Sequence, residues 1–162
     1  MIIKDEGIKL VSVNATSEIL KNKMLADNAV INMTETKLYP PNLPTEILFE
    51  IKSEEKLIGE FQFKSIRWFN RKAELSIFII KEYREKGFAK KTLKLAINFA
   101  FNRLNLHRLE AEVISFNDRA KKLIEELGFK EEGRLREAKY SSGKYYDIIR
   151  YGFLKSEFLA KE

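Results

Sequence analysis

A short basic turn is the first part of this sequence whose residues could do chemistry. An apolar run from Leu75 to Ile80 leads into a polar turn at 81–87, and a helical pattern begins at Phe88. A helix that starts directly after a turn points its first N–H groups into that turn without helical partners. The helix dipole adds positive potential, and Gly87 lets the backbone approach a bulky anion. The turn therefore predicts a phosphate or pyrophosphate site, with further charge from Arg84, Lys86, Lys90 and Lys91.

The helix that follows is predicted to be amphipathic. Its apolar residues recur at spacings of three and four, which places them on one stripe. The stripe consists of Ala89, Leu93, Ala96, Ile97, Ala100 and Leu104. The opposite face carries Lys90, Lys91, Lys94, Asn98 and Arg103. We therefore interpret Glu74 to Leu104 as a strand, a glycine turn and a helix, in that order.

Length and composition narrow the possible classes of protein. At 162 residues the chain fits one domain, 1–162, with a core of its own. No apolar run is long enough for a membrane span and the N-terminus carries charges, so we expect a cytoplasmic protein without membrane partners. With no cysteine and one histidine, we expect no disulfide and no metal site. The net charge of +6 suits a polyanionic ligand, nucleic acid or an acidic partner, or simply a solvated lysine-rich surface.

The N-terminal part is predicted to contain one strand, one helix and an irregular segment. Ile8 to Val13 alternates as a half-buried strand. Ser17 is placed to cap a helix. Val30 to Pro44 is irregular, and a substrate-recognition loop or a plain connector fits it equally well. The apolar stripe of the helix consists of Ile19, Leu20, Met24, Leu25 and Ala29.

The middle of the chain is predicted to form an antiparallel meander. Its three strands are Glu46 to Lys52, Lys56 to Ile66 and Ala73 to Ile80, joined by two polar turns. For Trp68 and Phe69 at the second turn, packing under the sheet edge is favoured over lining a cleft.

The last third is predicted to add a parallel strand, a helix and a hairpin. His107 to Val113 alternates as a strand, and a helix crossover makes it parallel to its partner. Asn117 or Asp118 caps the next helix, and Gly128 ends it. The inward residues of that helix are Ala120, Leu123, Ile124 and Leu127. Phe129 to Ala138 and Lys144 to Lys155 then form the final hairpin.

Two motifs at a characteristic separation carry a family resemblance. Arg84-Glu85-Lys86-Gly87-Phe88-Ala89 resembles the R/Q-x-x-G-x-G/A signature of the GNAT superfamily of acetyl-CoA-dependent N-acyltransferases. Asn117-x-x-Ala120-x-x-Leu123-x-x-x-Leu127-Gly128-Phe129 resembles its N-x-x-[AS]-x-x-L-x-x-x-G-F segment. The resemblance implies an α/β fold whose mixed, mostly antiparallel sheet splits at a central parallel strand pair flanked by helices. It also implies an acceptor-side half at 1–72 and an acetyl-CoA-binding and C-terminal half at 73–157.

The C-terminal segments resemble one branch of that superfamily. Glu132-Gly133-Arg134-Leu135-Arg136-Glu137 and Gly143-Lys144-Tyr145-Tyr146-Asp147 are similar to the pattern of the RimJ/RimL branch. That branch contains ribosomal-protein N-terminal acetyltransferases and relatives that act on small amines. The acceptor implied is therefore a protein N-terminus or a small-molecule amine. The basic surface argues mildly against a polycation such as spermidine.

The resemblance also implies a set of cofactor-binding residues. In GNAT enzymes the glycine turn cradles the CoA pyrophosphate, the split strands leave backbone groups free, and the asparagine binds the pantetheine arm. The Ile79 N–H is the expected oxyanion donor, although ordinary strand pairing is the alternative. The residues so implied are Phe78, Ile79, Ile80, Arg84, Glu85, Lys86, Gly87, Phe88, Ala89, Lys90, Asn117, Arg119 and Lys121.

The catalytic residues are less sharply indicated. The position of Glu74 resembles that of a family glutamate that acts as general base through a water, but an ion pair with Arg71 or Lys72 would explain it as well. Many relatives have a tyrosine as general acid where this chain has Ile124. A substitute could be solvent or the cluster Tyr140, Tyr145 and Tyr146, of which Tyr145 is preferred.

The expected function is direct transfer of an acetyl group from acetyl-CoA to a primary amine. Two alternatives keep the same fold without turnover: a CoA-binding sensor, and a basic ribosome- or RNA-associated module. No basic stripe with interleaved aromatics is present in the sequence, so we expect no direct nucleic-acid partner. The expected assembly is a monomer or a homodimer.

Overall fold

The computed structural model describes residues 2–5, 8–11, 13–27 and 42–160. The chain forms two compact units, 1–38 and 39–162, and each is described by itself. The expectation of a single domain stays a prediction. In the described residues no helix is both long and apolar enough to cross a membrane.

The first unit contains a small hairpin and one helix. Strand β1 (Ile2–Asp5) pairs antiparallel with β2 (Ile8–Val11), so the strand expected over Ile8 to Val13 is shorter and has a partner that the sequence did not indicate. Helix α1 (Glu18–Ala26) starts where predicted, because the Ser17 hydroxyl accepts a hydrogen bond from the Leu20 N–H at 3.3 Å. Ala29 and most of the segment Val30 to Pro44 lie outside the described residues.

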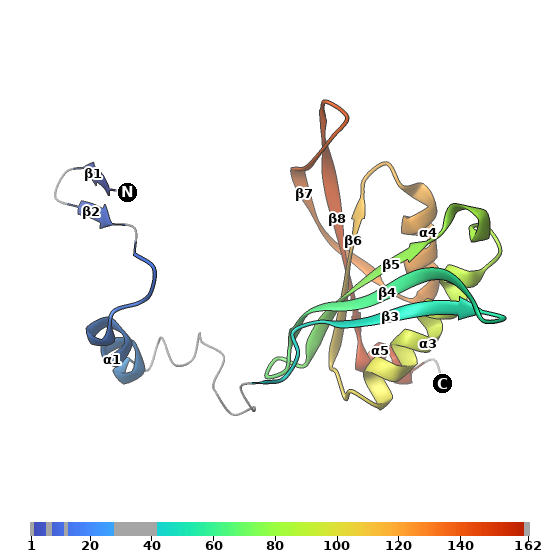
Figure 1. The fold of residues 1–162 in the computed structure, drawn as a ribbon, viewed down its shortest axis with the longest axis horizontal. Helices are drawn as coiled ribbons and strands as arrows, with labels where there is room; N and C mark the ends of the chain where they lie inside the picture. Colours follow the sequence, from blue (N-terminus) through green and yellow to red (C-terminus); the bar gives the residue numbers. More distant parts are fainter. Residues whose placement is uncertain (1, 6–7, 12, 28–41, 161–162) are drawn as a thin grey trace. The chain divides into compact units, whose positions relative to one another are not determined.

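The second unit is built on a six-stranded sheet with the order β3-β4-β5-β6-β8-β7 (Figure 1). Strands β3 (Ile47–Ser53), β4 (Lys56–Arg67) and β5 (Lys72–Ile79) form the predicted antiparallel meander. The first turn is tight because Glu54 and Glu55 both adopt positive φ, 49° and 63°. At the second turn, Trp68 is half-buried against the core and donates from Nε1 to the Pro44 carbonyl at 2.8 Å, which confirms packing for this ring.

Strands β5 and β6 (Arg108–Ile114) are parallel and are joined through helix α3 (Phe88–Asn102), as predicted. Their register covers only Lys72 to Glu74 on β5 and Arg108 to Glu110 on β6. Beyond these residues the register stops, so the sheet is split at its parallel pair. This confirms the predicted mixed sheet.

The chain ends with helix α4 (Asp118–Leu127), the hairpin of β7 (Lys130–Ser141) and β8 (Lys144–Leu154), and a short helix α5 (Lys155–Leu159). Asn117 caps α4, and Gly128 ends it with φ 106°. Lys155 begins α5 instead of ending the last strand, which corrects the predicted boundary. In Figure 1 the tip of the β7–β8 hairpin projects beyond the helices.

The core lies between one face of the sheet and the helices α3 and α4. Leu93, Ala96 and Ile97 of α3 are buried against Phe63 and Leu109 of the sheet. The stripe predicted for α3 is therefore the buried one, and it fixes the rotation of the helix about its axis. The first turn of α3 is consequently held at the sheet edge where β5 ends.

Candidate functional site

A groove of about 390 Å³ lies where the turn after β5, the start of α3 and the first turns of α4 meet. It contains most of the cofactor-binding residues expected from the sequence. Nine of those residues line it: Ile79, Arg84, Glu85, Gly87, Phe88, Ala89, Lys90, Asn117 and Arg119. The structure thus brings together two motifs that are about thirty residues apart in sequence.

The turn between β5 and α3 forms one wall of the groove, and contacts of Arg84 fix its conformation. Arg84 donates from Nε to the Ile79 carbonyl at 2.8 Å, and its guanidinium lies 5.6 Å from the centre of the Phe78 ring. Gly87 adopts φ 80° and ψ 0°, a left-handed conformation that favours glycine. No atom lies within 4 Å of a Cβ built on Gly87, so the space above the first turn of α3 is open to a ligand.

The backbone at the end of β5 turns one set of polar groups toward the split. The Ile80 N–H donates to the Ile58 carbonyl of β4 at 2.9 Å. Because N–H groups alternate in direction along a strand, the N–H of Ile79 points away from β4, to the side where β6 has separated. This geometry is compatible with an oxyanion donor, and that role stays a prediction.

Asn117 lies at the wall opposite the glycine turn. Its Oδ1 accepts a hydrogen bond from the Ala120 N–H at 3.1 Å and caps α4. A hydrogen bond from this side chain to a ligand would therefore come from its Nδ2 donor. The capping role and the predicted ligand-binding role can coexist.

Two ion pairs cross the groove from wall to wall. Arg119 of α4 contacts Glu85 of the turn at 2.7 Å, and Lys90 of α3 contacts Glu126 of α4 at 2.8 Å. The hydrogen bond from Lys90 lowers the pKa of the Glu126 carboxyl. All four side chains are 41–70% exposed, so these contacts are accessible to water and to a charged ligand.

Four of the expected cofactor residues lie outside the lining that the described residues provide: Phe78, Ile80, Lys86 and Lys121. Lys86 lies with Nζ 5.6 Å from the centre of the Tyr83 ring. Lys121 donates to the Ser115 carbonyl at 2.8 Å and pairs with Asp118 at 2.7 Å, so it holds the loop before α4.

Sequence reasoning also missed several lining residues: Tyr83, Ala120, Lys122, Leu123 and Glu126. Helical periodicity could have found two of them. Positions three and four apart share a face of a helix, so Lys122 and Glu126 lie on the same face as Arg119. Lys121 is rotated to a neighbouring face of α4, outside the lining of the groove.

The expected general base, Glu74, is held by a different partner from those predicted. Its carboxylate pairs with Lys64 at 2.9 Å, because the two residues face each other in the register of β4 and β5. The predicted ion pairs with Arg71 or Lys72 are therefore wrong. Lys72 instead contacts Glu110 of β6 at 3.1 Å. The Glu74 side chain is only 13% exposed.

The expected general acid, Tyr145, lies at the tip of the β7–β8 hairpin. It is 63% exposed, and its ring packs against that of Tyr140 at 5.1 Å between centres. It is not among the residues that line the groove. Its expected role as general acid stays a prediction.

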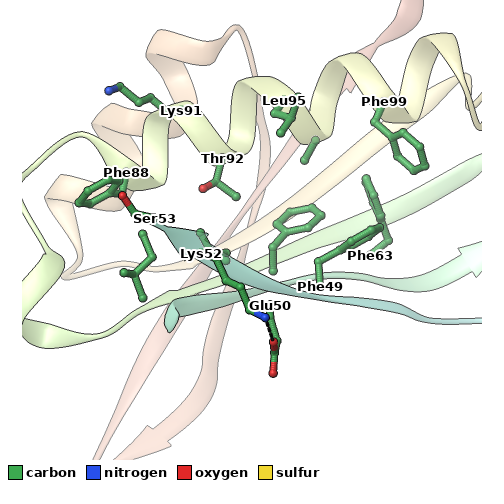
Figure 2. Close-up of a pocket in the computed structure, with 14 residues that line it drawn as sticks. Phe49, Glu50, Lys52, Ser53, Phe63, Phe88, Lys91, Thr92, Leu95 and Phe99 are labelled. Carbon is green, nitrogen blue, oxygen red and sulfur yellow. Dashed lines mark ion pairs between the residues drawn. The ribbon is translucent and has the colours of Figure 1, made fainter. Parts of the chain in front are cut away.

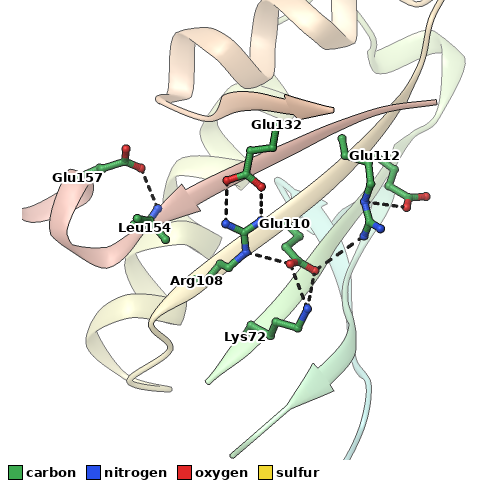
Figure 3. A network of polar contacts seen from close by, with 8 residues as sticks. Lys72, Arg108, Glu110, Glu112, Glu132, Leu154 and Glu157 are labelled. Carbon is green, nitrogen blue, oxygen red and sulfur yellow. Dashed lines mark hydrogen bonds and ion pairs between the residues drawn. The ribbon is translucent and has the colours of Figure 1, made fainter. Parts of the chain in front are cut away.

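A network of ion pairs braces the strands where β5 and β6 are still paired (Figure 3). Arg108 binds both carboxylate oxygens of Glu132 and donates from Nε to Glu110 at 2.9 Å. Burial alone would raise the pKa of Glu110, but hydrogen bonds from Arg108 and Lys72 outweigh it and lower that pKa. The hydrogen bonds from Arg108 likewise lower the pKa of Glu132. The network therefore fixes the last paired residues before the split.

A second groove, of about 690 Å³, lies between β3 and the side of α3 (Figure 2). Phenylalanine rings dominate its lining, including Phe49, Phe61, Phe63 and Phe99. Of the expected cofactor residues it shares only Phe88 with the first groove. Its apolar walls do not suit phosphate groups, so the charged groove is the candidate active site.

Comparison with known proteins defines the family. Residues 8–149 match the model of the acetyltransferase (GNAT) domain family. The chain therefore belongs to the GNAT acetyltransferase family and is an N-acetyltransferase. It is 35% identical over 143 residues to the spermidine N(1)-acetyltransferase of Vibrio cholerae, covering 88% of this chain and 73% of that enzyme.

A solved structure and one further relative extend this comparison. A dodecameric structure of the Vibrio cholerae spermidine N-acetyltransferase matches with a TM-score of 0.71 and 33% identity, covering 90% of this chain and 76% of that one. A putative ribosomal N-acetyltransferase of Bacillus subtilis is 32% identical over 102 residues. That match covers 63% of this chain and 56% of the Bacillus protein.

Proposed function

We propose that the charged groove binds acetyl-CoA and that the acceptor is a small-molecule primary amine of the polyamine class, such as spermidine. The observation that carries the binding proposal is the open left-handed turn at Gly87, which aims the first N–H groups of α3 into a basic groove beside the split. The similarity to spermidine acetyltransferases supports the choice of amine. It outweighs the mild objection from net charge, because overall charge says little about a local site.

Acetyl-CoA would supply the thioester carbonyl that the amine nitrogen attacks, and its sulfur would leave as thiolate when the C–S bond breaks. The Ile79 N–H would donate to the oxyanion, a role that the hydrogen bond of the next residue to β4 supports. Glu74 would accept the ammonium proton through a water. Its ion pair with Lys64 orients the carboxylate on the sheet face near the point where β5 and β6 separate.

The second candidate acceptor is a protein N-terminus, as in the RimJ/RimL branch. The C-terminal motifs around Glu132 and Gly143 and the Bacillus subtilis relative favour it. A panel of spermidine, an amino sugar and a short peptide with a free N-terminus, each with acetyl-CoA, separates the candidates by relative kcat/KM. Turnover of the peptide alone would replace the polyamine proposal.

Measuring the molecular mass of the protein in solution in the same buffer distinguishes the expected monomer or homodimer from a larger assembly.

Replacing Glu74 with glutamine tests the enzyme mechanism. We expect kcat to fall by about 100-fold, since removal of a general base typically has this size of effect. Acetyl-CoA affinity should be unchanged, because Glu74 does not line the groove. Glu50→Gln is the matched control, as it removes another carboxylate that pairs with a lysine on the same sheet. Equal values of kcat for Glu74→Gln and the control would exclude Glu74 as the base.

A protein that binds acetyl-CoA but acetylates no amine would support the sensor alternative.

A further inference from the structure

Among the described residues, two of the four cations that line the groove are already engaged by carboxylates of the same groove. Arg119 contacts Glu85, and Lys90 contacts Glu126, each pair joining the α3 side of the groove to α4. All four residues line the groove. A phosphate that enters must therefore compete with Glu85 and Glu126 for these cations.

We propose that Glu85 and Glu126 act as resident substitutes for the cofactor phosphates, and that each cation exchanges its carboxylate for a phosphate oxygen when acetyl-CoA binds. This inference rests on the proposed function of the groove. It assigns to the two carboxylates a role in setting cofactor affinity. They lower the affinity of the site for phosphates and so ease release of the CoA product.

The energetics favour such an exchange. Ion pairs between exposed side chains contribute little to stability, so breaking them costs little. Hydrogen bonds between an arginine and a phosphate are charge-assisted and can be bidentate, which makes them stronger than the single contact to Glu85. After the exchange the carboxylates remain beside the phosphates, and their repulsion limits the net gain.

The opposite role for the carboxylates makes an opposite prediction. If Glu85 served to aim Arg119 at the ligand, its loss would weaken acetyl-CoA binding. If it competes with the ligand, its loss strengthens binding. The sign of the change in Kd therefore decides between the two roles.

The experiment is calorimetric titration of acetyl-CoA into wild type, Glu85→Gln, Glu126→Gln and the double variant. We expect Kd to fall by about threefold to tenfold in each single variant, the range expected for releasing one exposed pair beside a charged ligand. The Kd of pantetheine, which lacks phosphates, should be the same for wild type and for the variants. Glu82→Gln is the matched control, because it removes the same charge from the neighbouring 3-10 turn η1 (Lys81–Tyr83) without lying in the lining.

A double-mutant cycle tests the exchange itself. In an Arg119→Met background, Glu85→Gln should improve acetyl-CoA binding less than it does in wild type, because no cation is left to release and only the repulsion between Glu85 and the phosphates is relieved. Three outcomes would each overturn the inference. Glu85→Gln could bind acetyl-CoA more weakly than wild type, or gain no more affinity than Glu82→Gln. It could also gain as much affinity in the Arg119→Met background as in wild type. Failure of folded wild type to bind acetyl-CoA would instead remove the proposed function, and the inference with it.

Discussion

Ion pairs occur in two contrasting settings in this protein. Those of the groove, Arg119–Glu85 and Lys90–Glu126, join side chains that are 41–70% exposed, and each pair has one close contact. Those at the base of the split sheet join Arg108 and Glu110, which are 25% and 15% exposed, to several partners at once. The first set joins two elements between which a ligand can enter. The second set joins β6 to the neighbouring strand β5 and, across β8, to β7.

The difference shows that the same residue types serve different purposes according to burial and number of contacts. Exposed single pairs contribute little to stability and can be given up to a ligand. A partly buried pair with several hydrogen bonds is costly to break, because the remaining charge loses its partner in a poorly solvated place. We therefore assign the groove pairs to binding and the network to holding the sheet.

The largest expected effect comes from the glycine turn that forms one wall of the groove. Gly87→Asp places a negative charge where a phosphate should lie and should raise the Kd of acetyl-CoA by about 100-fold, or about 2.7 kcal/mol. Gly87→Asn is the matched control, because asparagine tolerates the left-handed conformation as well as aspartate does but adds no charge. Calorimetric titration measures both. An equal increase in Kd in the two variants would show that backbone strain at position 87, and not the added charge, weakens acetyl-CoA binding.

The second effect separates the two sets of ion pairs directly. Arg108→Met should lower the free energy of unfolding by about 2 kcal/mol, somewhat below the cost for a fully buried pair because Arg108 is partly exposed. Arg119→Met makes the same chemical change in the groove and should alter stability by less than about 0.5 kcal/mol. Urea denaturation of both variants at neutral pH gives the comparison. A similar loss of unfolding free energy in Arg108→Met and Arg119→Met would contradict the distinction between the network and the groove pairs.

Much of the fold could be predicted because its signals are local. The stripe on α3 needed only a period of 3.6, and the ends of α4 needed only Asn117 and Gly128. The parallel β5–β6 pair followed from the crossover rule, and the groove followed from two motifs. The short helix α5 and the strand β1 were missed, because neither has a long periodic pattern or a distinctive cap.

The contacts that set the chemistry of the site could not be predicted in the same way. The partner of Glu74 depends on the register of β4 against β5, which the sequence did not specify to the residue. The partners of Arg119 and Lys90 depend on how α4 packs beside α3. The two groove pairs join residues 34 and 36 positions apart, so only the folded chain reveals them.

The network also predicts how stability responds to acid. The folded-state pKa values of Glu110 and Glu132 are lowered below the ordinary value of 4.5. Their contribution to stability is therefore present above pH 4.5 and is lost as the pH falls through the lower, folded-state values. Wild type should lose more unfolding free energy than Glu110→Gln between about pH 6 and pH 3, since glutamine cannot titrate. If wild type and Glu110→Gln lost the same unfolding free energy as the pH fell, the charge of Glu110 would not contribute to stability.

The smallest effect distinguishes two adjacent lysines on α4. Lys122 lines the groove, whereas Lys121 is held by the Ser115 carbonyl and Asp118. Lys122→Met should weaken acetyl-CoA binding by about threefold, the effect of one exposed charge near a polyanion, and this loss should shrink as salt is added. Lys121→Met should leave Kd unchanged and lower stability slightly, because it releases the loop before α4. Both variants carry the same change in net charge, so long-range electrostatics cannot account for a difference between them. Lys121→Met could instead weaken acetyl-CoA binding more than Lys122→Met. Lys121 would then have to leave Ser115 and Asp118 to reach the ligand. That result would contradict the assignment of the Lys121 contacts to stability.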